Sequence, residues 1–319
     1  MTTAQFAITH AGPQITVQDA GRGGLLRYGV PRSGPMDRSA HRIANLAVGN
    51  AEAAPAIEVS LGGLALHCTH GRVSFATAGG RFQVMLNNRL LPPWGVAGLA
   101  AGDTLTIRPG RWGAWCYLAF AGHLNSNVWL GSAATHGPSG LGGGTLISAG
   151  SLTIRDAEVR PARHCGLDIP VSARPRHRVR VVIGPQDRFF AAAMLQTLVT
   201  SPFTLTDASD RMGVRLSGPL LTPDAALDMP SEPVQRGSVQ VAGDGVATVL
   251  LADHQTTGGY PKIATILSGD LDGFVQLRSR SVVHFDAVSP QAAVAAYRTR
   301  HLVHGGFLAH LAGRQDHKD

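Results

Sequence analysis

The stretch VATVLLADHQTTGGYPK, residues 246–262, is the part of the sequence that most directly indicates the fold. Its first six residues are apolar or β-branched, and such a short run before a turn-rich segment is typical of a β-strand. Residues 179–183, VRVVI, form a similar run, and 39 glycines and 19 prolines supply frequent turns. These features predict a mainly β protein.

The composition is that of a folded protein large enough for two domains. The chain has 319 residues, of which 44% are hydrophobic and 15% charged. A basic, proline-containing stretch divides it, so we expect an N-terminal half at 1–165, a linker at 166–178, a C-terminal half at 179–305 and a tail at 306–319. The N-terminus lacks a signal-peptide pattern and no run of eighteen apolar residues occurs, so a cytoplasmic protein without membrane contact is expected.

Further elements follow from local patterns. The predicted strands are 73–78, 104–108 and 115–121 in the first half, and a strand ending at Ile183, 214–216, 239–241 and 246–251 in the second. The predicted helices are 37–48, capped by Asp37 and ended by Gly49, then 187–198, and one that begins at Ser289 and Pro290.

Charge and cysteine patterns exclude several classes of function. The net charge is +7, but the arginines concentrate between residues 160 and 180 and no nucleic-acid-binding motif accompanies them. We therefore expect no nucleic-acid partner. Cys68, Cys116 and Cys165 are isolated, and the fourteen histidines form no HxH or HExxH arrangement. No metal site is expected.

Several longer blocks follow one another in a distinctive order. They are VQDAGRGGLLRYGVPRSGPMDRSAHRIANLAVGN (17–50), AIEVSLGGLAL (56–66), GPQDRFF (184–190), SDRMGVRLSGP (209–219) and LLADHQTTGGYPKIATILSGDL (250–271). Together they resemble the signature blocks of the KipA family, which is also called the C-subunit family of 5-oxoprolinase, allophanate hydrolase subunit 2 or the biotin-dependent carboxyltransferase family. The resemblance extends from about residue 14 to residue 285.

The resemblance implies a fold of two cyclophilin-like β-barrel halves. It also implies one component of an ATP-dependent 5-oxoprolinase, which opens the lactam of 5-oxoproline to glutamate together with a KipI-type B subunit and a LamB/YcsF-type A subunit. Two alternatives stay open. One is the carboxyltransferase component of a urea or amide carboxylase, and the other is a non-catalytic regulator that binds a KipI-like protein.

The lysines limit which cofactors this chain can carry. Lys262 and Lys318 are the only two, neither lies between methionines as in a biotinyl acceptor, and there is no GxxxxGK[ST] phosphate loop. We expect no covalent biotin here, and expect ATP to be used in the assembled complex, on a partner protein or at a shared site.

The loop after the 246–251 strand is the first candidate site, with Gln255, Thr256, Thr257 and Lys262 as candidate catalytic residues. Their side chains could donate hydrogen bonds to an amide or carboxylate, and Lys262 could stabilise a developing oxyanion. The substrate-binding candidates Gly258, Gly259 and Tyr260 complete the loop, where glycines allow close approach of the backbone. The alternative is a tight turn whose lysine pairs with Asp253 or Asp270.

Arg211 and Asp210 form the second candidate pair, because an arginine held by a carboxylate can bind a substrate carboxylate through two hydrogen bonds. A plain turn-pinning pair is the alternative. Gln186 and Asp187 are expected only to begin a helix.

In the first half, Arg22, Ser33 and Asp37 are the substrate-binding candidates beside a glycine-rich turn and a helix start. Capping alone would also explain Asp37. Among the departures from the family pattern, Ala133 and His254 stand where arginines are usual, and Gln235 stands where a proline is usual. If those arginines contact substrate, the departures imply an altered substrate or a loss of activity.

Overall fold

The computed structural model describes residues 2–224 and 229–313. The chain divides into two compact units. Of the described residues, unit 1 contains 2–22, 37–174 and 304–313, and unit 2 contains 23–36, 175–224 and 229–303. The short segment 23–36 thus groups with the second half of the chain. The domain boundaries expected from the sequence, at 165, 178 and 305, stay predictions.

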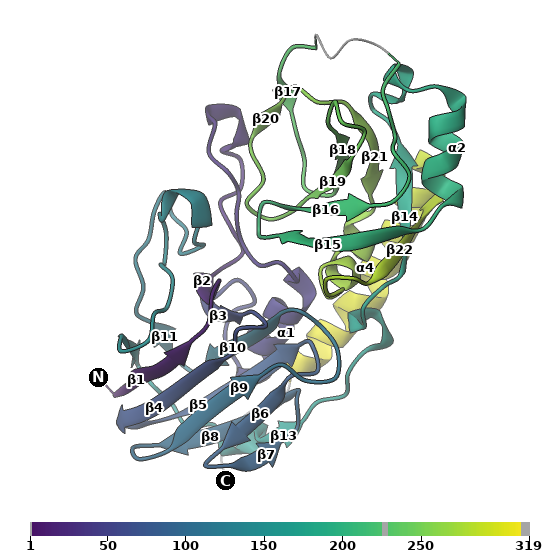
Figure 1. The fold of residues 1–319 in the computed structure, drawn as a ribbon. Helices are drawn as coiled ribbons and strands as arrows, with labels where there is room; N and C mark the ends of the chain where they lie inside the picture. The colour runs from purple at the N-terminus through teal and green to yellow at the C-terminus, as the bar shows by residue number, and fades with distance from the viewer. Residues whose placement is uncertain (1, 225–228, 314–319) are drawn as a thin grey trace. The chain divides into compact units, whose positions relative to one another are not determined.

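Unit 1 is built from two antiparallel sheets (Figure 1). One has the order β11-β12-β1-β4-β9-β6-β7 and the other β13-β8-β5-β10-β3-β2. Phe6 of β1 and Phe120 of β10 lie with ring centroids 5.1 Å apart, so the sheets pack face to face. The strands are β1 Thr3–Ala11, β2 Thr16–Gln18, β3 Ala56–Val59, β4 Leu64–His70, β5 Arg72–Gly79, β6 Gln83–Leu86, β7 Arg89–Leu91, β8 Gly95–Ala100, β9 Thr104–Arg108, β10 Cys116–Phe120, β11 His123–Leu124, β12 Ser151–Arg155 and β13 Cys165–Gly166.

Helix α1, Arg38–Val48, covers the second of these sheets, and its ends are those predicted. The Asp37 side chain accepts a hydrogen bond from the Ala40 amide at 2.9 Å, and Gly49 ends the helix in the left-handed conformation with φ 88°. A side-chain cap and a glycine at these positions satisfy end groups that the helix itself cannot pair.

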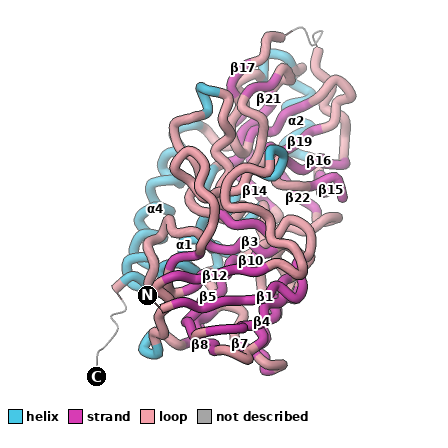
Figure 2. Tube along the Cα trace, turned by 90° about the vertical axis from the view of Figure 1, so that its left-hand side faces the viewer, coloured by secondary structure: helices cyan, strands magenta, loops and turns pink. Residues whose placement is uncertain are grey.

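Unit 2 contains a closed seven-stranded barrel with the order β14-β21-β18-β19-β16-β15-β22. Figure 2 shows its strands in magenta around β14, β19 and β21. The mainly β prediction is confirmed, and the barrel expected for the second half is present. The strands are β14 Arg178–Ile183, β15 Phe203–Ser209, β16 Gly213–Ser217, β18 Ser238–Val241, β19 Ala247–Leu250, β21 Lys262–Ile266 and β22 Val282–Ala287, with β17 Glu232–Pro233 and β20 Thr257–Gly258 as a separate pair.

The helices of unit 2 depart in part from the sequence prediction. The segment 187–198 is not one helix, because a 3₁₀ turn at Asp187–Phe189 precedes α2, Ala192–Thr200. The helix predicted at Ser289 and Pro290 is confirmed as α4, Pro290–Ala312, which continues through residues predicted to be tail. A third helix, α3 at Ser268–Phe274, was not predicted.

A buried carboxylate fixes α3 against the barrel. Asp270 accepts hydrogen bonds from the amide and Nε of Arg180 at 2.9 Å and from its NH2 at 2.7 Å, and Arg176 NH1 lies 3.1 Å away. Burial alone would raise the pKa of Asp270, but the hydrogen bonds and charges of the two arginines outweigh it and hold the pKa below its usual value near 3.8.

Asp270→Asn should therefore destabilise unit 2 by about 3 kcal/mol at neutral pH, because an amide cannot replace the paired carboxylate. A carboxyl whose folded pKa is depressed stabilises the fold above its unfolded pKa and stops doing so as pH falls. The difference in the free energy of unfolding between wild type and Asp270→Asn should thus become smaller below about pH 4. Urea unfolding of both proteins over a pH series measures the destabilisation and its pH dependence. A difference in the free energy of unfolding that stays constant down to about pH 3 would contradict the ionic role of Asp270.

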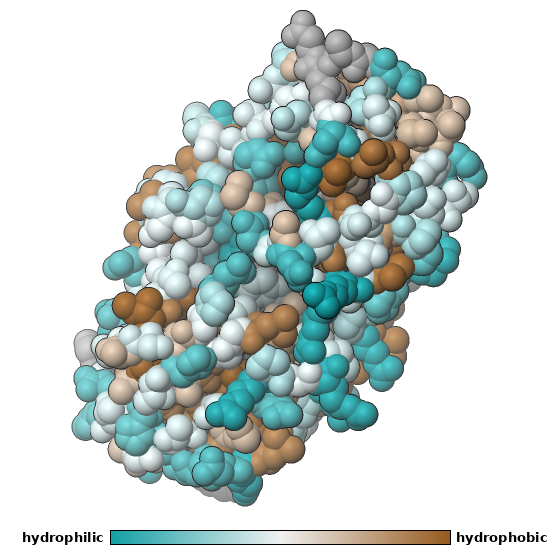
Figure 3. Space-filling model, in the orientation of Figure 1, coloured by the Kyte–Doolittle hydropathy of each residue, from teal (hydrophilic) through white to brown (hydrophobic). Residues whose placement is uncertain are grey.

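Among the described residues, no helix is both long and apolar enough to cross a membrane. Figure 3 shows polar and apolar side chains interspersed on the face in view. This mixture is ordinary for a protein surface.

Candidate functional site

The loop 253–262 in unit 2 is shaped by backbone pairing. Gly258 and Thr257 of β20 pair with Glu232 and Pro233 of β17, and the Val234 amide donates to the Thr256 carbonyl at 3.1 Å. A Cβ at residue 258 would lie 2.8 Å from Gln240 Nε2, so any side chain there would displace the Gln240 amide. Glycine at 258 permits this close approach to Gln240, and an approach of the glycine pair to a ligand stays a prediction.

Polar side chains of this loop border a cavity beside the barrel strands β16, β18 and β19. The cavity has a volume of about 480 Å³, and its lining includes Asp210, Gln240, Gln255 and Tyr260. Gln240 organises one side of it, since its Nε2 donates to the Tyr260 carbonyl and its Oε1 accepts from Gln255 Nε2, both at 3.2 Å. The structure thus brings three predicted residues to one hollow and adds Gln240 to them.

Lys262 is the most unusual group in unit 2. Its side chain is almost wholly buried, and Nζ makes no hydrogen bond to any residue in the described part of the chain. The nearest carboxylate oxygen is Glu232 Oε2 at 3.7 Å, on a side chain that is 41% exposed. Asp253 and Asp270, the partners considered from the sequence, are bound instead by Arg211 and by Arg180. A buried amine without a hydrogen bond is costly to the fold unless something else requires it.

Gln186 supports this lysine, although its sequence context indicated only a helix start. Its Oε1 accepts the Lys262 amide at 2.9 Å, and its Nε2 donates to Glu232 Oε2. Its own amide donates to the Lys262 carbonyl at 3.2 Å. Gln186 therefore fixes both the backbone of Lys262 and the carboxylate nearest to the amine.

Arg211 is held in place by Asp253 and not by Asp210. Its Nε and NH2 bind the two oxygens of Asp253 at 2.9 and 3.1 Å, and NH2 also donates to the Gly34 carbonyl at 2.7 Å. Asp210 instead closes its own turn by accepting the amides of Met212 and Gly213. Arg211 thereby joins the start of the loop to the segment 23–36.

Ser33 lies in that segment and shares a property with Lys262. It is buried, its φ is 54°, and its hydroxyl has no hydrogen-bond partner within residues 2–224 and 229–313. A non-glycine residue with positive φ is strained, and such strain often accompanies functional segments. Arg236 fixes the same segment by donating to the carbonyls of Pro35 and Met36.

The other two predicted residues, Arg22 and Asp37, lie in unit 1. Arg22 donates to the carbonyls of Trp129 and Ala134, and its guanidinium stacks 4.6 Å from the Trp129 ring centroid. The Asp37 side chain caps α1, and the Asp37 amide donates to Tyr117 Oη at 2.7 Å. These contacts give both residues a structural role in unit 1.

The two positions where the family usually has arginine lie in buried surroundings. Ala133 is 2% exposed, and its amide donates to Asp19 Oδ2 at 2.7 Å. His254 is 4% exposed, and its Nδ1 lies 2.6 Å from the Gln255 carbonyl oxygen. His254 therefore constrains the candidate loop directly. Within the described residues, no group of three His, Cys, Asp or Glu side chains could hold a metal ion.

Replacement of Lys262 by methionine should leave the fold as stable as wild type or up to about 2 kcal/mol more stable, because it removes a buried charge without a hydrogen bond. Gln240→Met is the matched control on the neighbouring strand, and it should destabilise because Gln240 is hydrogen-bonded on both sides. Urea unfolding compares the two variants. A larger destabilisation by Lys262→Met than by Gln240→Met would assign the lysine a structural role.

The barrel and the loop that carries the buried lysine lie within a stretch that matches one protein family. The model of this family, described as carboxyltransferase domain, subdomain A and B, matches residues 28–287. The chain is 34% identical to the C subunit of 5-oxoprolinase from Haemophilus influenzae over 89% of its own length and 92% of that protein. It is 35% identical to the corresponding C subunit from Escherichia coli, over 91% and 93% of the two chains.

The chain therefore belongs to the carboxyltransferase-domain family that includes the C subunits of 5-oxoprolinase, and the resemblance seen in the sequence is confirmed. A likeness in fold extends further. The urea carboxylase of Kluyveromyces lactis matches 98% of the chain with a TM-score of 0.84 at 23% identity, and the chain corresponds to 30% of that longer protein.

Proposed function

We propose that this chain is the C subunit of a 5-oxoprolinase, which opens the lactam of 5-oxoproline to L-glutamate with the use of ATP. The observation that carries the proposal is the buried Lys262 amine, in a chain whose similarity to two 5-oxoprolinase C subunits covers nearly its whole length. An amine that the fold leaves without a hydrogen bond is prepared to bind an anionic group of a substrate.

In this proposal Lys262 stabilises the negative charge that develops on the lactam oxygen when the ring amide carbonyl is attacked. In a buried site this charge interaction is stronger than in water, and the Gln186 hydrogen bond to the Lys262 amide keeps the lysine in place beforehand. The hydroxyls of Thr256 and Thr257 and the amide of Gln255 then orient the substrate at the loop.

ATP and the remaining catalytic groups come from the assembled complex. We propose a KipI-type B subunit and a LamB/YcsF-type A subunit as partners, because the chain is similar to proteins named as C subunits of 5-oxoprolinase and resembles the KipA family. The chain itself has neither a GxxxxGK[ST] loop nor a biotinyl-lysine context. A site shared between proteins would place substrate groups of one chain against those of another.

Lys262→Met should lower the turnover of the reconstituted complex by about 100-fold or more, since it removes an oxyanion-stabilising group. Lys262→Arg should not restore it, because the guanidinium is larger and differently shaped. The rate of glutamate formation under saturating 5-oxoproline measures the turnover of both variants. Co-purification of the partners is the control for assembly. Normal turnover in a correctly assembled Lys262→Met complex would refute this role.

The purified chain alone, given 5-oxoproline, ATP and magnesium, should form no glutamate, and addition of the A and B subunits from the same genome should start ATP-dependent formation. Avidin should have no effect. Strong inhibition by avidin would move the assignment to carboxyl transfer, the reaction named in the family description. Turnover by the isolated chain would contradict a shared site, and a complex that binds tightly but stays inert would favour a regulator.

A further inference from the structure

A second cavity lies within unit 1, between the ends of its two sheets. Its volume is about 400 Å³, and strands β6 and β7 form one wall while β5 and β8 form the other. Phe75, Val84 and Val96 are each less than 5% exposed and make much of this lining apolar. Cavities of this size and polarity are typical of small-molecule sites.

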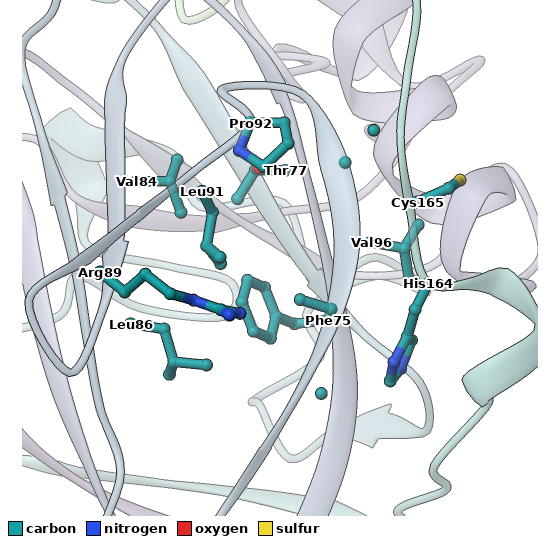
Figure 4. Close-up of a pocket in the computed structure, with 14 residues that line it drawn as sticks. Phe75, Thr77, Val84, Leu86, Arg89, Leu91, Pro92, Val96, His164 and Cys165 are labelled. Carbon is teal, nitrogen blue, oxygen red and sulfur yellow. The ribbon is translucent and has the colours of Figure 1, made fainter.

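One charged side chain points into this apolar space. Leu86 pairs with Arg89 and Val84 with Leu91 across β6 and β7, so all four project from the same face of the sheet. Val84 is fully buried, which identifies that face as the inner one. Figure 4 shows Arg89 directed into the cavity, toward the side where Phe75 and His164 lie.

The Arg89 guanidinium has no counter-charge at this site. No hydrogen bond or ion pair joins its side chain to another residue of the described chain, and none of the cavity-lining residues is acidic. An arginine presents paired N–H donors that match the two oxygens of a carboxylate. The cavity therefore combines an apolar wall with one planar cation at its edge, and no acidic residue of the lining neutralises that cation.

The opposite side of the cavity adds a neutral side chain. Ser74 Oγ accepts the Arg160 amide at 2.8 Å, so its own hydrogen can be donated to His164 Nε2, also 2.8 Å away. Burial lowers the pKa of His164, and a neutral ring that accepts at Nε2 carries its proton on Nδ1. His164 thus adds no second positive charge to that of Arg89, so the cavity suits a ligand with one negative charge better than a ligand with two.

We propose that this cavity binds a small apolar monocarboxylate, with its hydrocarbon part against Phe75, Val84 and Leu91 and its carboxylate on Arg89. The site lies wholly within unit 1 and is distinct from the Lys262 loop of unit 2. It does not depend on the proposed 5-oxoprolinase activity.

A purely structural role for Arg89 makes a different prediction. β7 is the edge strand of its sheet, and an inward-pointing charge on an edge strand prevents edge-to-edge association of sheets. That role requires a charge at residue 89, but it requires neither an open cavity beside the charge nor affinity for an anion.

Isothermal titration of the full chain with octanoate, octanamide and octylammonium separates the two roles. Octanoate should bind, octanamide should bind about tenfold or more weakly, and octylammonium should not bind. Arg89→Gln should weaken octanoate binding about tenfold and leave octanamide binding unchanged. Arg72→Gln, which replaces an exposed arginine on β5 outside the cavity, is the matched control and should change nothing.

A second variant tests the cavity without touching the charge. Ala97 lines the cavity and pairs with Phe75 across β5 and β8, so Ala97→Leu should fill the space and weaken the binding of both octanoate and octanamide. Thermal unfolding checks that each variant is folded. Absence of octanoate binding by wild type, or equal binding by wild type and Arg89→Gln, would overturn the proposal. Self-association of Arg89→Gln with unchanged octanoate affinity would assign Arg89 to edge protection.

Discussion

The buried ion pair between Arg211 and Asp253 is the interaction on which the candidate site of unit 2 depends. Both side chains are at most 5% exposed, and the same guanidinium also holds the Gly34 carbonyl. A buried pair of this kind tolerates the loss of neither partner, because the remaining charge would be left uncompensated. It therefore fixes two stretches distant in sequence, the start of the loop at Asp253 and the strained segment at Ser33.

The chain binds its buried carboxylates with arginine, and this contrasts with the surroundings of Lys262. The buried acids Asp253 and Asp270 are both bound by arginines, whose planar donors suit paired carboxylate oxygens. The carboxylate that pairs with Lys262 is that of the half-exposed Glu232, at a distance beyond a hydrogen bond. An ammonium is a compact charge that can serve one incoming oxygen, and this property is why the proposed function assigns Lys262 to a ligand.

The sequence predicted those features whose signals are local. The cap at Asp37, the glycine at 49 and the short apolar runs placed α1 and the predicted strands correctly, since each depends on neighbouring residues. Helix α3 was missed because its seven residues include two glycines and two aspartates, and the contact that holds it, from Asp270 to Arg180, spans 90 residues. Lys262 could be found by its rarity, whereas Gln186 could not, because its partners lie 46 and 76 residues away.

The two cations singled out by the structure differ in how much water they keep, and this difference sets what each can do. Lys262 is buried, so in the proposed function a charge developing beside it would be stabilised strongly and the benefit would fall on reaction rate. Arg89 is exposed at a cavity edge, so much of its attraction for an anion is offset by lost hydration. The apolar wall must then supply most of the binding free energy there, while Arg89 supplies the preference for a carboxylate over an amide.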